Sequence, residues 1–278
     1  MLFLPPKQLQ RLCQEYGIKP SKSYGQNYLV DPLPIEAMVA AGELKKTDTV
    51  VEIGPGFGVL TLALAPEVKK VISFEIEKKL TKYWQEQIEE NEIKNLEIIW
   101  GDVLQQFPKL ETSKLDNYKV IANLPYQITS PIIRMFLETK NPPQIMIFMV
   151  QKEVAERICA KPGDMSLLAI SVQYYADAEV ILNVPRILFW PAPEVDSAVI
   201  AIKTVKNQEK KKISDNDFFK LVRAGFAQKR KLLIKNLLPY YNKEKLNQAF
   251  TELGLKPTAR AQELSVSDWQ RLSTYLYN

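Results

Sequence analysis

Histidine is absent from the sequence, and this absence limits the chemistry open to the protein. It excludes a serine–histidine–aspartate triad, a cysteine–histidine pair and any zinc or iron site with histidine ligands. Proton transfer would have to use carboxylates, tyrosine, lysine, the backbone or water. Cysteine is scarce as well: Cys13 and Cys159 lie far apart in the chain and match no metal-binding or redox spacing. Two reduced thiols of this kind are typical of a cytosolic protein.

Long apolar runs are also missing. No stretch reaches the length of a membrane span, and residues 1–6 lack the basic and apolar regions of a secretion signal. The longest apolar run, residues 145–150, is typical of a buried strand. We therefore expect a cytoplasmic protein without a membrane partner or a bound metal. Because no feature of the sequence indicates a dimer, we expect a monomer.

The positive charge of the chain is concentrated near its C-terminus. The whole sequence has 37 Lys and Arg against 32 Asp and Glu, whereas residues 207–278 alone have 14 against 7. A basic module beside a near-neutral one indicates an RNA, DNA or anionic-membrane partner. A solvated lysine-rich surface would give the same charge pattern.

Apolar strands alternate with helical segments over most of the chain. The predicted strands are residues 49–53, 70–74, 96–100, 119–122 and 145–150, followed by two closing strands at 180–183 and 197–203. Such an alternation predicts an α/β fold with a parallel, doubly wound sheet.

A lysine-rich polar run near residues 204–214 marks the expected domain boundary. We place one domain at residues 1–205 and a second at residues 206–278. The second domain is predicted to be entirely helical. Its expected helices are residues 217–236, 243–253 and 267–277.

A glycine-rich turn follows the first predicted strand. Gly54, Gly56 and Gly58 allow the backbone to bend sharply and to approach a ligand closely. The turn lacks the GxxxxGK[ST] pattern that cradles phosphates, so an ATP site is not expected. By itself it fits a plain strand–helix turn, a dinucleotide site or an S-adenosylmethionine site.

Acidic residues follow at the ends of the next two strands. Glu75 could accept hydrogen bonds from both ribose hydroxyls of an adenosyl group, and Asp102 could accept one from an adenine amino group. Either carboxylate alone could be an ordinary surface residue. Together, the glycine turn, Glu75 and Asp102 lie at the carboxyl ends of three successive strands. This arrangement indicates a ligand site, because ligands of open α/β sheets bind at these ends.

The tetrapeptide Asn123-Leu124-Pro125-Tyr126 comes directly after the fourth strand, at the same edge. The amine of an adenine is a poor nucleophile, because its lone pair is delocalised into the ring. The Asn123 side-chain oxygen and the Leu124 carbonyl could accept its two N–H groups and localise that lone pair. Pro125 fixes the backbone of the turn, and Tyr126 offers a face on which a base can stack.

This tetrapeptide alone leaves the substrate open. A simple Asn-x-Pro turn without a catalytic role is one interpretation. If the turn does methylate an amine, that amine could belong to DNA, RNA, a protein glutamine or a free base. No strong base is needed, since the proton can leave to water after methyl transfer. Most of the catalysis would come from positioning the amine for in-line attack.

Taken together, these residues resemble the ribosomal RNA adenine N6-dimethyltransferases, and the resemblance runs over almost the whole chain. Glu75, Asp102 and several longer segments match the motifs of that family in order. These segments are residues 23–29, 50–61, 123–131, 150–157 and 189–197.

The resemblance implies a Rossmann-like class I methyltransferase with a seven-stranded, mostly parallel sheet, its last strand antiparallel, and a small helical C-terminal domain. It also implies S-adenosylmethionine as the cofactor. The residues expected to bind it are Asn27, Leu29, Gly54, Gly56, Glu75, Asp102 and Asn123. Phe189 would stack on the target adenine opposite Tyr126, and would join the tetrapeptide as a catalytic residue. Without the resemblance, Phe189 is more simply a packed core or hinge residue.

Two branches of this family differ in substrate. One dimethylates two adjacent adenosines near the 3′ end of small-subunit ribosomal RNA, late in assembly of the particle. The other dimethylates one adenosine of large-subunit RNA and confers macrolide resistance. Residues 219–237 and 260–265 resemble segments of the small-subunit branch, so this substrate and a 30S-type assembly particle are the expected partners. A purely non-enzymatic assembly factor is the remaining alternative.

The segment 219–237 also interleaves basic and apolar residues. Its apolar positions are interpreted as core, and its basic positions as a phosphate-contacting face. The RNA-binding candidates are Lys220, Arg223, Lys229, Arg230 and Lys231. The chain departs from the family pattern at a few positions, among them Tyr28 for Phe, Lys229 for Arg, Leu232 for Thr and Glu194 for Lys. The last change puts one phosphate contact in doubt.

Overall fold

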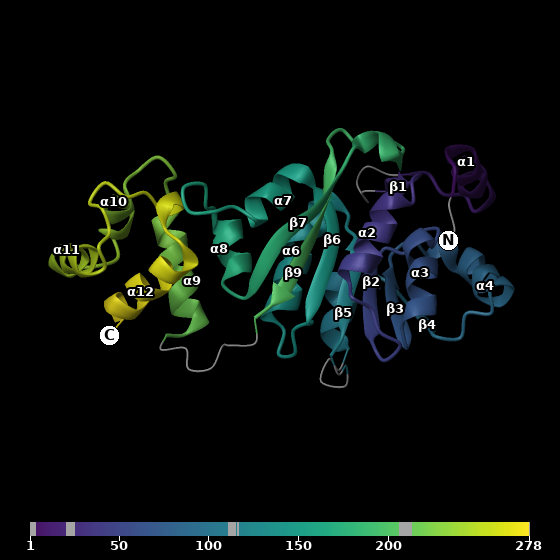
Figure 1. Ribbon diagram of the computed structural model, residues 1–278, viewed down its shortest axis with the longest axis horizontal. Helices are drawn as coiled ribbons and strands as arrows, with labels where there is room; N and C mark the ends of the chain where they lie inside the picture. The colour runs from purple at the N-terminus through teal and green to yellow at the C-terminus, as the bar shows by residue number, and fades with distance from the viewer. Residues whose placement is uncertain (1–3, 21–25, 111–114, 116, 206–212, 278) are drawn as a thin grey trace. The chain divides into compact units, whose positions relative to one another are not determined.

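The computed structural model describes residues 4–20, 26–110, 115, 117–205 and 213–277. The chain forms two compact units. The first comprises Met1–Ala155 and Ala178–Thr204, and the second comprises Glu156–Asp177 and Val205–Asn278. Both are drawn in Figure 1.

A seven-stranded sheet forms the frame of the first unit, with strand order β4-β3-β2-β5-β6-β9-β7 (Figure 1). The strands are β2 (Thr49–Ile53), β3 (Lys70–Glu75), β4 (Leu96–Trp100), β5 (Lys119–Asn123), β6 (Ile145–Gln151), β7 (Ala176–Val184) and β9 (Ser197–Thr204). The pairs among β2 to β6 are parallel, and β9 is antiparallel to β6. The predicted α/β class, the mostly parallel sheet and its antiparallel last strand are therefore confirmed.

The chain order explains why a binding site forms on this sheet. The chain starts at β2, moves outward to β4, and then returns to place β5 on the other side of β2. Such a reversal leaves a crevice at the carboxyl ends of the two central strands. The strands are nearly continuous apolar runs, with Val50, Val120 and Ile147 fully buried, as expected for parallel strands covered on both faces.

Helices connect these strands. They are α1 (Pro6–Glu15), α2 (Leu33–Ala41), α3 (Val59–Leu64), α4 (Thr81–Glu90), α5 (Val103–Gln106), α6 (Thr129–Glu138) and α7 (Lys152–Ile158). A separate two-stranded antiparallel sheet joins β1 (Tyr28–Leu29) to β8 (Phe189–Trp190). The structure therefore pairs two segments that lie far apart in the sequence.

The second unit is helical, as predicted. Its helices are α8 (Leu167–Gln173), α9 (Asp215–Gly225), α10 (Leu233–Leu237), α11 (Lys243–Glu252) and α12 (Val266–Tyr277). Trp269 is fully buried at the centre of its core. Tyr174 stacks on Phe218 with ring centroids 4.1 Å apart, which packs the segment before β7 against α9.

The segment 156–177 was not expected in this unit. It lies before the predicted boundary at residues 205 and 206, yet it packs with the C-terminal helices. The division into functional domains at that boundary stays a prediction, whereas the units of packing are discontinuous in the sequence.

The single helix predicted for residues 217–236 is wrong. The structure has two helices there, α9 ending at Gly225 and α10 beginning at Leu233. The buried Asn236 side chain explains the break, because its Nδ2 donates to the carbonyls of Gly225 at 2.6 Å and Gln228 at 3.1 Å. These bonds satisfy carbonyls that a continuous helix would have used internally.

Within the described ranges, no helix is both long and apolar enough to cross a membrane. The same residues contain no group of three or more potential metal ligands among His, Cys, Asp and Glu.

Gly225 should be indispensable to the second unit. A Cβ atom there would lie 2.3 Å from Cη2 of Trp269 and 2.9 Å from Cδ1 of Leu233. Alanine favours a helix over glycine by about 1 kcal/mol, but overpacking costs about 1–3 kcal/mol. We expect Gly225→Ala to lower the melting temperature. Trp269→Phe removes the clashing indole carbon, so the same change should cost less in that background, and equal costs in both would contradict the steric explanation.

Candidate active site

The candidate site lies at the carboxyl ends of the central strands. β2 leads into Gly54, β3 ends at Glu75, and β5 ends at Asn123. β2 pairs with both β3 and β5 in parallel, so these ends meet at one edge of the sheet. The sequence prediction that these residues gather there is confirmed for this part of the site.

The glycine turn bends sharply, as the sequence predicted, and does so through left-handed backbone conformations. Gly54, Gly56 and Gly58 have φ angles of 68°, 54° and 81°. A Cβ on Gly56 would lie 3.3 Å from the ring of Tyr28, and one on Gly58 would lie 2.8 Å from the ring of Trp84. Glycine at positions 56 and 58 thus combines backbone freedom with close packing.

Glu75 is buried at the end of β3, with 4 % of its surface exposed. Its Oε2 accepts a hydrogen bond from the Gly56 amide at 3.1 Å, and its Oε1 accepts one from the Glu77 amide at 2.7 Å. Burial raises the pKa of Glu75, and the backbone hydrogen bonds oppose that rise. Each carboxylate oxygen retains a further lone pair that can accept a ligand hydroxyl.

Glu52 is a second buried carboxyl at this edge, and the sequence analysis did not select it. Its Oε2 accepts hydrogen bonds from Thr61 at 2.8 Å and Ser73 at 2.6 Å. Its Oε1 is buried without a hydrogen-bond partner. Burial raises the pKa of Glu52 to about 7, although the two hydroxyl hydrogen bonds act in the opposite direction.

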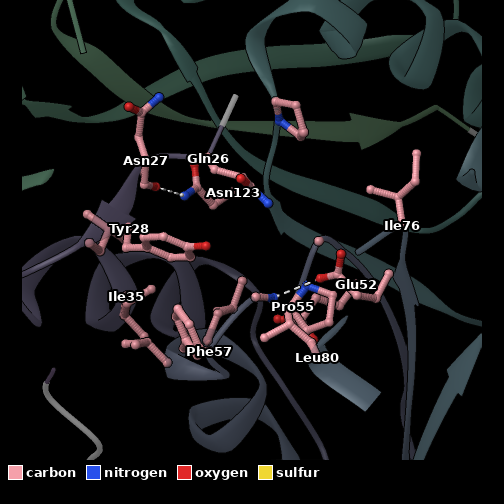
Figure 2. Close-up of a pocket in the computed structure, with 17 residues that line it drawn as sticks. Gln26, Asn27, Tyr28, Ile35, Glu52, Pro55, Phe57, Ile76, Leu80 and Asn123 are labelled. Carbon is pink, nitrogen blue, oxygen red and sulfur yellow. Dashed lines mark hydrogen bonds between the residues drawn. The ribbon is translucent and has the colours of Figure 1, made fainter. Parts of the chain in front are cut away.

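A pocket opens among these groups (Figure 2). Six of the seven residues predicted to bind the cofactor line it: Asn27, Leu29, Gly54, Gly56, Glu75 and Asn123. Figure 2 shows Asn27 and Asn123 on one side, Pro55 and Leu80 on the other, and the ring of Tyr28 reaching between them. We call this space the cofactor pocket, after the ligand that the sequence predicts for it.

Asp102 does not line the cofactor pocket. It is the N-cap of α5, where its Oδ1 accepts a hydrogen bond from the Leu104 amide at 3.0 Å. Its Oδ2 accepts a weaker one from Gln105 at 3.4 Å. The structure therefore gives Asp102 a capping role, and its predicted contact with an adenine amino group stays a prediction.

The predicted catalytic turn sits where β5 ends. The Nδ2 of Asn123 donates to the Asn27 carbonyl at 3.4 Å, which leaves the Oδ1 of Asn123 as an acceptor. The Leu124 amide donates to the Met149 carbonyl at 3.1 Å, and the Leu124 side chain is buried. Only the main chain of Leu124 can thus serve a ligand. Pro125 lines the cofactor pocket and precedes a short 3-10 turn, Tyr126–Ile128.

A second pocket includes the end of the same turn. Its lining includes Tyr126, Gln127, Gln151 and the loop residues 191–194. Gln26 and Asn27 line both this pocket and the cofactor pocket. We call it the substrate pocket, because it includes Tyr126, which the sequence predicts to stack on the target base. The two hollows therefore share lining residues, and the turn supplies Asn123 and Pro125 to one and Tyr126 to the other.

Phe189 lines neither pocket. It pairs with Leu29 across the β1–β8 sheet and is 4 % exposed, within a core cluster that also contains Val184. This is the packed position that the sequence allowed as the simpler interpretation. Stacking of Phe189 on a target base stays a prediction, and the ring would have to leave this position to make that contact.

The RNA-binding candidates lie in the second unit. Lys220 and Arg223 are on α9, whereas Lys229, Arg230 and Lys231 lie in the segment between α9 and α10. All five side chains are exposed. The sequence predicted a single helix carrying all five basic residues. Because α9 ends before Lys229, these residues do not lie along one helix face.

Residues missed by the sequence analysis also line the cofactor pocket. They include Glu52, Ile76 and Leu80. Ile76 follows Glu75 and is 49 % exposed, which is unusual for an isoleucine at a strand end. The sequence does contain a signal for Glu52, which is a charged residue inside the apolar run 49–53. Charged residues are seldom buried without a function or a partner.

Comparison with known proteins agrees with this geometry. The sequence model of the ribosomal RNA adenine dimethylase family matches residues 17–278. The chain belongs to this family. It is 39% identical over 267 residues to the ribosomal RNA small subunit methyltransferase A of Dehalococcoides mccartyi, covering 95% of the chain and 91% of that protein. The protein of the same name from Geobacillus kaustophilus is 39% identical over 284 residues, which cover 98% and 96% of the two chains.

Solved structures confirm the fold of this family member. A dimethyladenosine transferase from Plasmodium falciparum matches with a TM-score of 0.76 and 27% identity, over 88% of this chain and 95% of that one. A 23S rRNA methyltransferase, ErmE, matches with a TM-score of 0.74 and 25% identity, over 91% and 100%. The class I methyltransferase fold and the enzymatic character predicted from the sequence are confirmed.

Glu52 should make stability depend on pH in this family member. Its pKa is raised from 4.5 to about 7, so its proton is bound more tightly in the folded state. The resulting stabilisation is present below pH 4.5 and is lost as the pH rises to 7. At about 1.4 kcal/mol per pKa unit, the loss is ~3 kcal/mol. Urea unfolding of wild type and Glu52→Gln between pH 4.5 and 8 would measure it.

The glutamine variant is the matched control, because its amide oxygen can still accept from Thr61 and Ser73 but does not titrate. We expect wild type to lose stability relative to this variant over that range. If the unfolding free energies of wild type and Glu52→Gln changed equally with pH, the raised pKa assigned to Glu52 would be contradicted.

Proposed function

We propose that this protein transfers methyl groups from S-adenosylmethionine to the N6 amines of two adjacent adenosines near the 3′ end of small-subunit ribosomal RNA. The family, and relatives named as small-subunit methyltransferases, support an RNA adenine as the substrate. We further propose that it acts in the cytoplasm on a 30S-type assembly particle, as a monomer.

One observation carries the proposal. The cofactor pocket and the substrate pocket share Gln26 and Asn27, and the turn from Asn123 to Tyr126 contributes Asn123 and Pro125 to the first and Tyr126 to the second. A methyl donor in the first pocket and an amine in the second would face each other across this turn. Holding two reactants in such an arrangement replaces a bimolecular encounter with an effectively unimolecular step.

The acceptor groups and apolar side chains of the cofactor pocket fit S-adenosylmethionine. Glu75 supplies carboxylate oxygens that can accept ribose hydroxyls, and the apolar side chains of Ile76 and Leu80 suit the faces of an adenine. The backbone at Gly56 leaves room that a Cβ would narrow. The unpartnered Oε1 of Glu52 adds acceptor capacity for a cationic ligand. When bound, S-adenosylmethionine supplies an activated methyl group on a sulfonium.

The catalytic turn can prepare the amine for attack. Because Asn123 donates its Nδ2 to the Asn27 carbonyl, its Oδ1 is oriented as an acceptor. The Oδ1 of Asn123 and the Leu124 carbonyl would each take one N–H of the adenine amine. The nitrogen lone pair is then directed at the methyl group, and water removes the proton after transfer. Each adenosine receives two methyl groups, so the pocket has to accept a monomethylated amine.

The face of Tyr126 provides the stacking surface for the base. Stacking on an aromatic side chain is worth about 1–3 kcal/mol per base. Tyr126 lines the substrate pocket, and burial raises its pKa, so it remains neutral. A neutral ring suits stacking better than an anionic one beside an electron-rich base.

Asn123 should be essential for transfer but not for cofactor binding. Removing one positioned hydrogen-bonding group of this kind costs about 10²–10³ in rate. We therefore expect Asn123→Ala to lose at least that much activity, while the dissociation constant for S-adenosylmethionine changes little. The measurement is transfer of labelled methyl groups to undermethylated small subunits, followed by mapping of the modified bases, with calorimetry for cofactor binding.

The same assay separates the alternatives. Near-wild-type transfer by Asn123→Ala would contradict the role of the turn. Transfer to purified 23S RNA, with none to small subunits, would favour the large-subunit activity. Absence of saturable S-adenosylmethionine binding to wild type would favour a non-enzymatic assembly factor.

The exposed basic residues of the second unit should set the salt dependence of binding. Replacing Lys229, Arg230 and Lys231 by alanine should weaken binding to small-subunit RNA at low salt. The slope of log K against log salt should fall by roughly 0.7–0.9 for each phosphate that the variant no longer neutralises. Filter binding between 50 and 200 mM salt would measure it. Lys45→Ala is the control, since Lys45 is exposed before β2, at the opposite end of that strand from the site. An equal loss of binding in this variant would contradict a specific contact between the three basic residues and the RNA.

A further inference from the structure

We propose that Ser197 is a positioning residue for methyl transfer: its hydroxyl holds the hydroxyl of Tyr126 and so fixes the Tyr126 ring as a wall of the substrate pocket. The inference rests on the proposed function, because that function gives the Tyr126 ring its role in stacking on the target base. Ser197 itself would not touch the base or the cofactor.

The contact is close and partly buried. The Tyr126 hydroxyl and the Ser197 Oγ are 2.7 Å apart, a normal length for a hydrogen bond between two hydroxyls. Ser197 is 0% exposed and Tyr126 is half-buried. Loss of Tyr126 as a partner would leave the Ser197 hydroxyl unsatisfied in a buried place, which costs more than the bond contributes in water.

Ser197 belongs to the rigid frame of the site. It is the first residue of β9, and it lies opposite Gln151 in the β6–β9 pair. β6 in turn pairs with β5, where Met149 lies opposite Asn123. Two adjacent ladders thus fix Ser197 relative to Asn123.

Tyr126 lacks such a support of its own. It lies beyond the end of β5, in the 3-10 turn Tyr126–Ile128. Its hydrogen bond to Ser197 ties this turn back to the sheet across β6. Since a shift of about 1 Å in a reacting group can cost about 10²-fold in rate, holding the ring in place matters more than the strength of the bond suggests.

The direction of the hydroxyl also limits what Tyr126 can do. Because its oxygen is turned toward Ser197, the face of the ring, and not the oxygen, is left for the base. The raised pKa of Tyr126 agrees with this, since a protonated phenol is a poor general base.

The loop that precedes Ser197 has its own restraints. The Arg186 amide donates to Asp196 Oδ1 at 2.9 Å, and the Arg186 guanidinium donates to the Glu194 carbonyl at 3.0 Å. The Lys152 amide donates to the Asp196 carbonyl at 3.0 Å. Removal of the Ser197 hydroxyl should therefore leave this loop and β9 folded.

A double-mutant cycle tests the proposal. Wild type, Ser197→Ala, Tyr126→Phe and the double variant would be compared in methyl transfer to undermethylated small subunits, with melting temperature and S-adenosylmethionine affinity measured in parallel. We expect each single change to lower kcat roughly tenfold with little change in KM for the particle. The double variant should be no slower than the singles, because both remove the same hydrogen bond. Cofactor affinity should stay within about twofold of wild type.

Thr204→Val is the matched control. Thr204 ends the same strand and donates its hydroxyl to the Pro143 carbonyl at 2.6 Å, far along β9 from the turn. This variant should retain the wild-type rate, whereas Ser197→Ala should not.

Several results would overturn the inference while leaving the proposed function intact. They are a wild-type rate for Ser197→Ala, additive losses in the double variant, and a much larger loss for Tyr126→Phe than for Ser197→Ala, which would mean that the Tyr126 oxygen contacts the substrate. Loss of activity in Ser197→Ala together with lower melting temperature and weaker cofactor binding would make Ser197 a purely structural residue. A wild type that transfers no methyl group to any RNA would overturn the proposed function and this inference with it.

Discussion

The register of the parallel sheet is the constraint on which the site depends. β2 pairs residue by residue with β3 and also with β5, so the segments after these strands emerge at one edge. The glycine turn, Glu75 and Asn123 come from three separate stretches of the chain and meet only because of these pairings. The same ladders extend through β6 to β9 and bring Ser197 beside Tyr126. A shift of one residue in any pair would turn these side chains to the opposite face.

The electrostatics of this edge come from burial more than from ion pairing. Glu52 and Glu75 are both almost completely enclosed, and burial is the main cause of the raised pKa of each. Hydroxyl and amide donors partly offset that cost. Within the described ranges neither carboxyl has a basic partner, and two such carboxyls favour a ligand that is cationic and rich in hydroxyl groups. In a chain without histidine, such a site is suited to positioning and charge complementarity, and less to proton transfer by a strong base.

The small β1–β8 sheet links the two pockets. Leu29 in the wall of the cofactor pocket pairs with Phe189, and Tyr28 pairs with Trp190, just before the loop that lines the substrate pocket. These segments are distant in the sequence and their strands are too short for an alternating pattern to reveal. Only the family resemblance indicated functional residues in these two segments. Nothing in the sequence indicated that β1 pairs with β8. For Phe189 the sequence allowed both a packed and a base-stacking position, because the two look the same in a proline-rich loop, and the structure places the ring in the core.

The sequence by itself determined the local chemistry and the fold class. The positions of β2 and β4 follow directly from their apolar runs, the three positive φ angles at 54, 56 and 58 from their glycines, and the turn after β5 from the order Asn-Leu-Pro-Tyr. Only the tertiary structure decided which of these groups act together. It broke the expected helix at Gly225 through the side chain of Asn236, joined residues 156–177 to the C-terminal helices, turned Asp102 into a helix cap, and brought the unsuspected Glu52 and Ser197 to the site. The physical reason is that local patterns record backbone preference and burial, whereas partners across a sheet or a core depend on long-range packing that no single segment encodes.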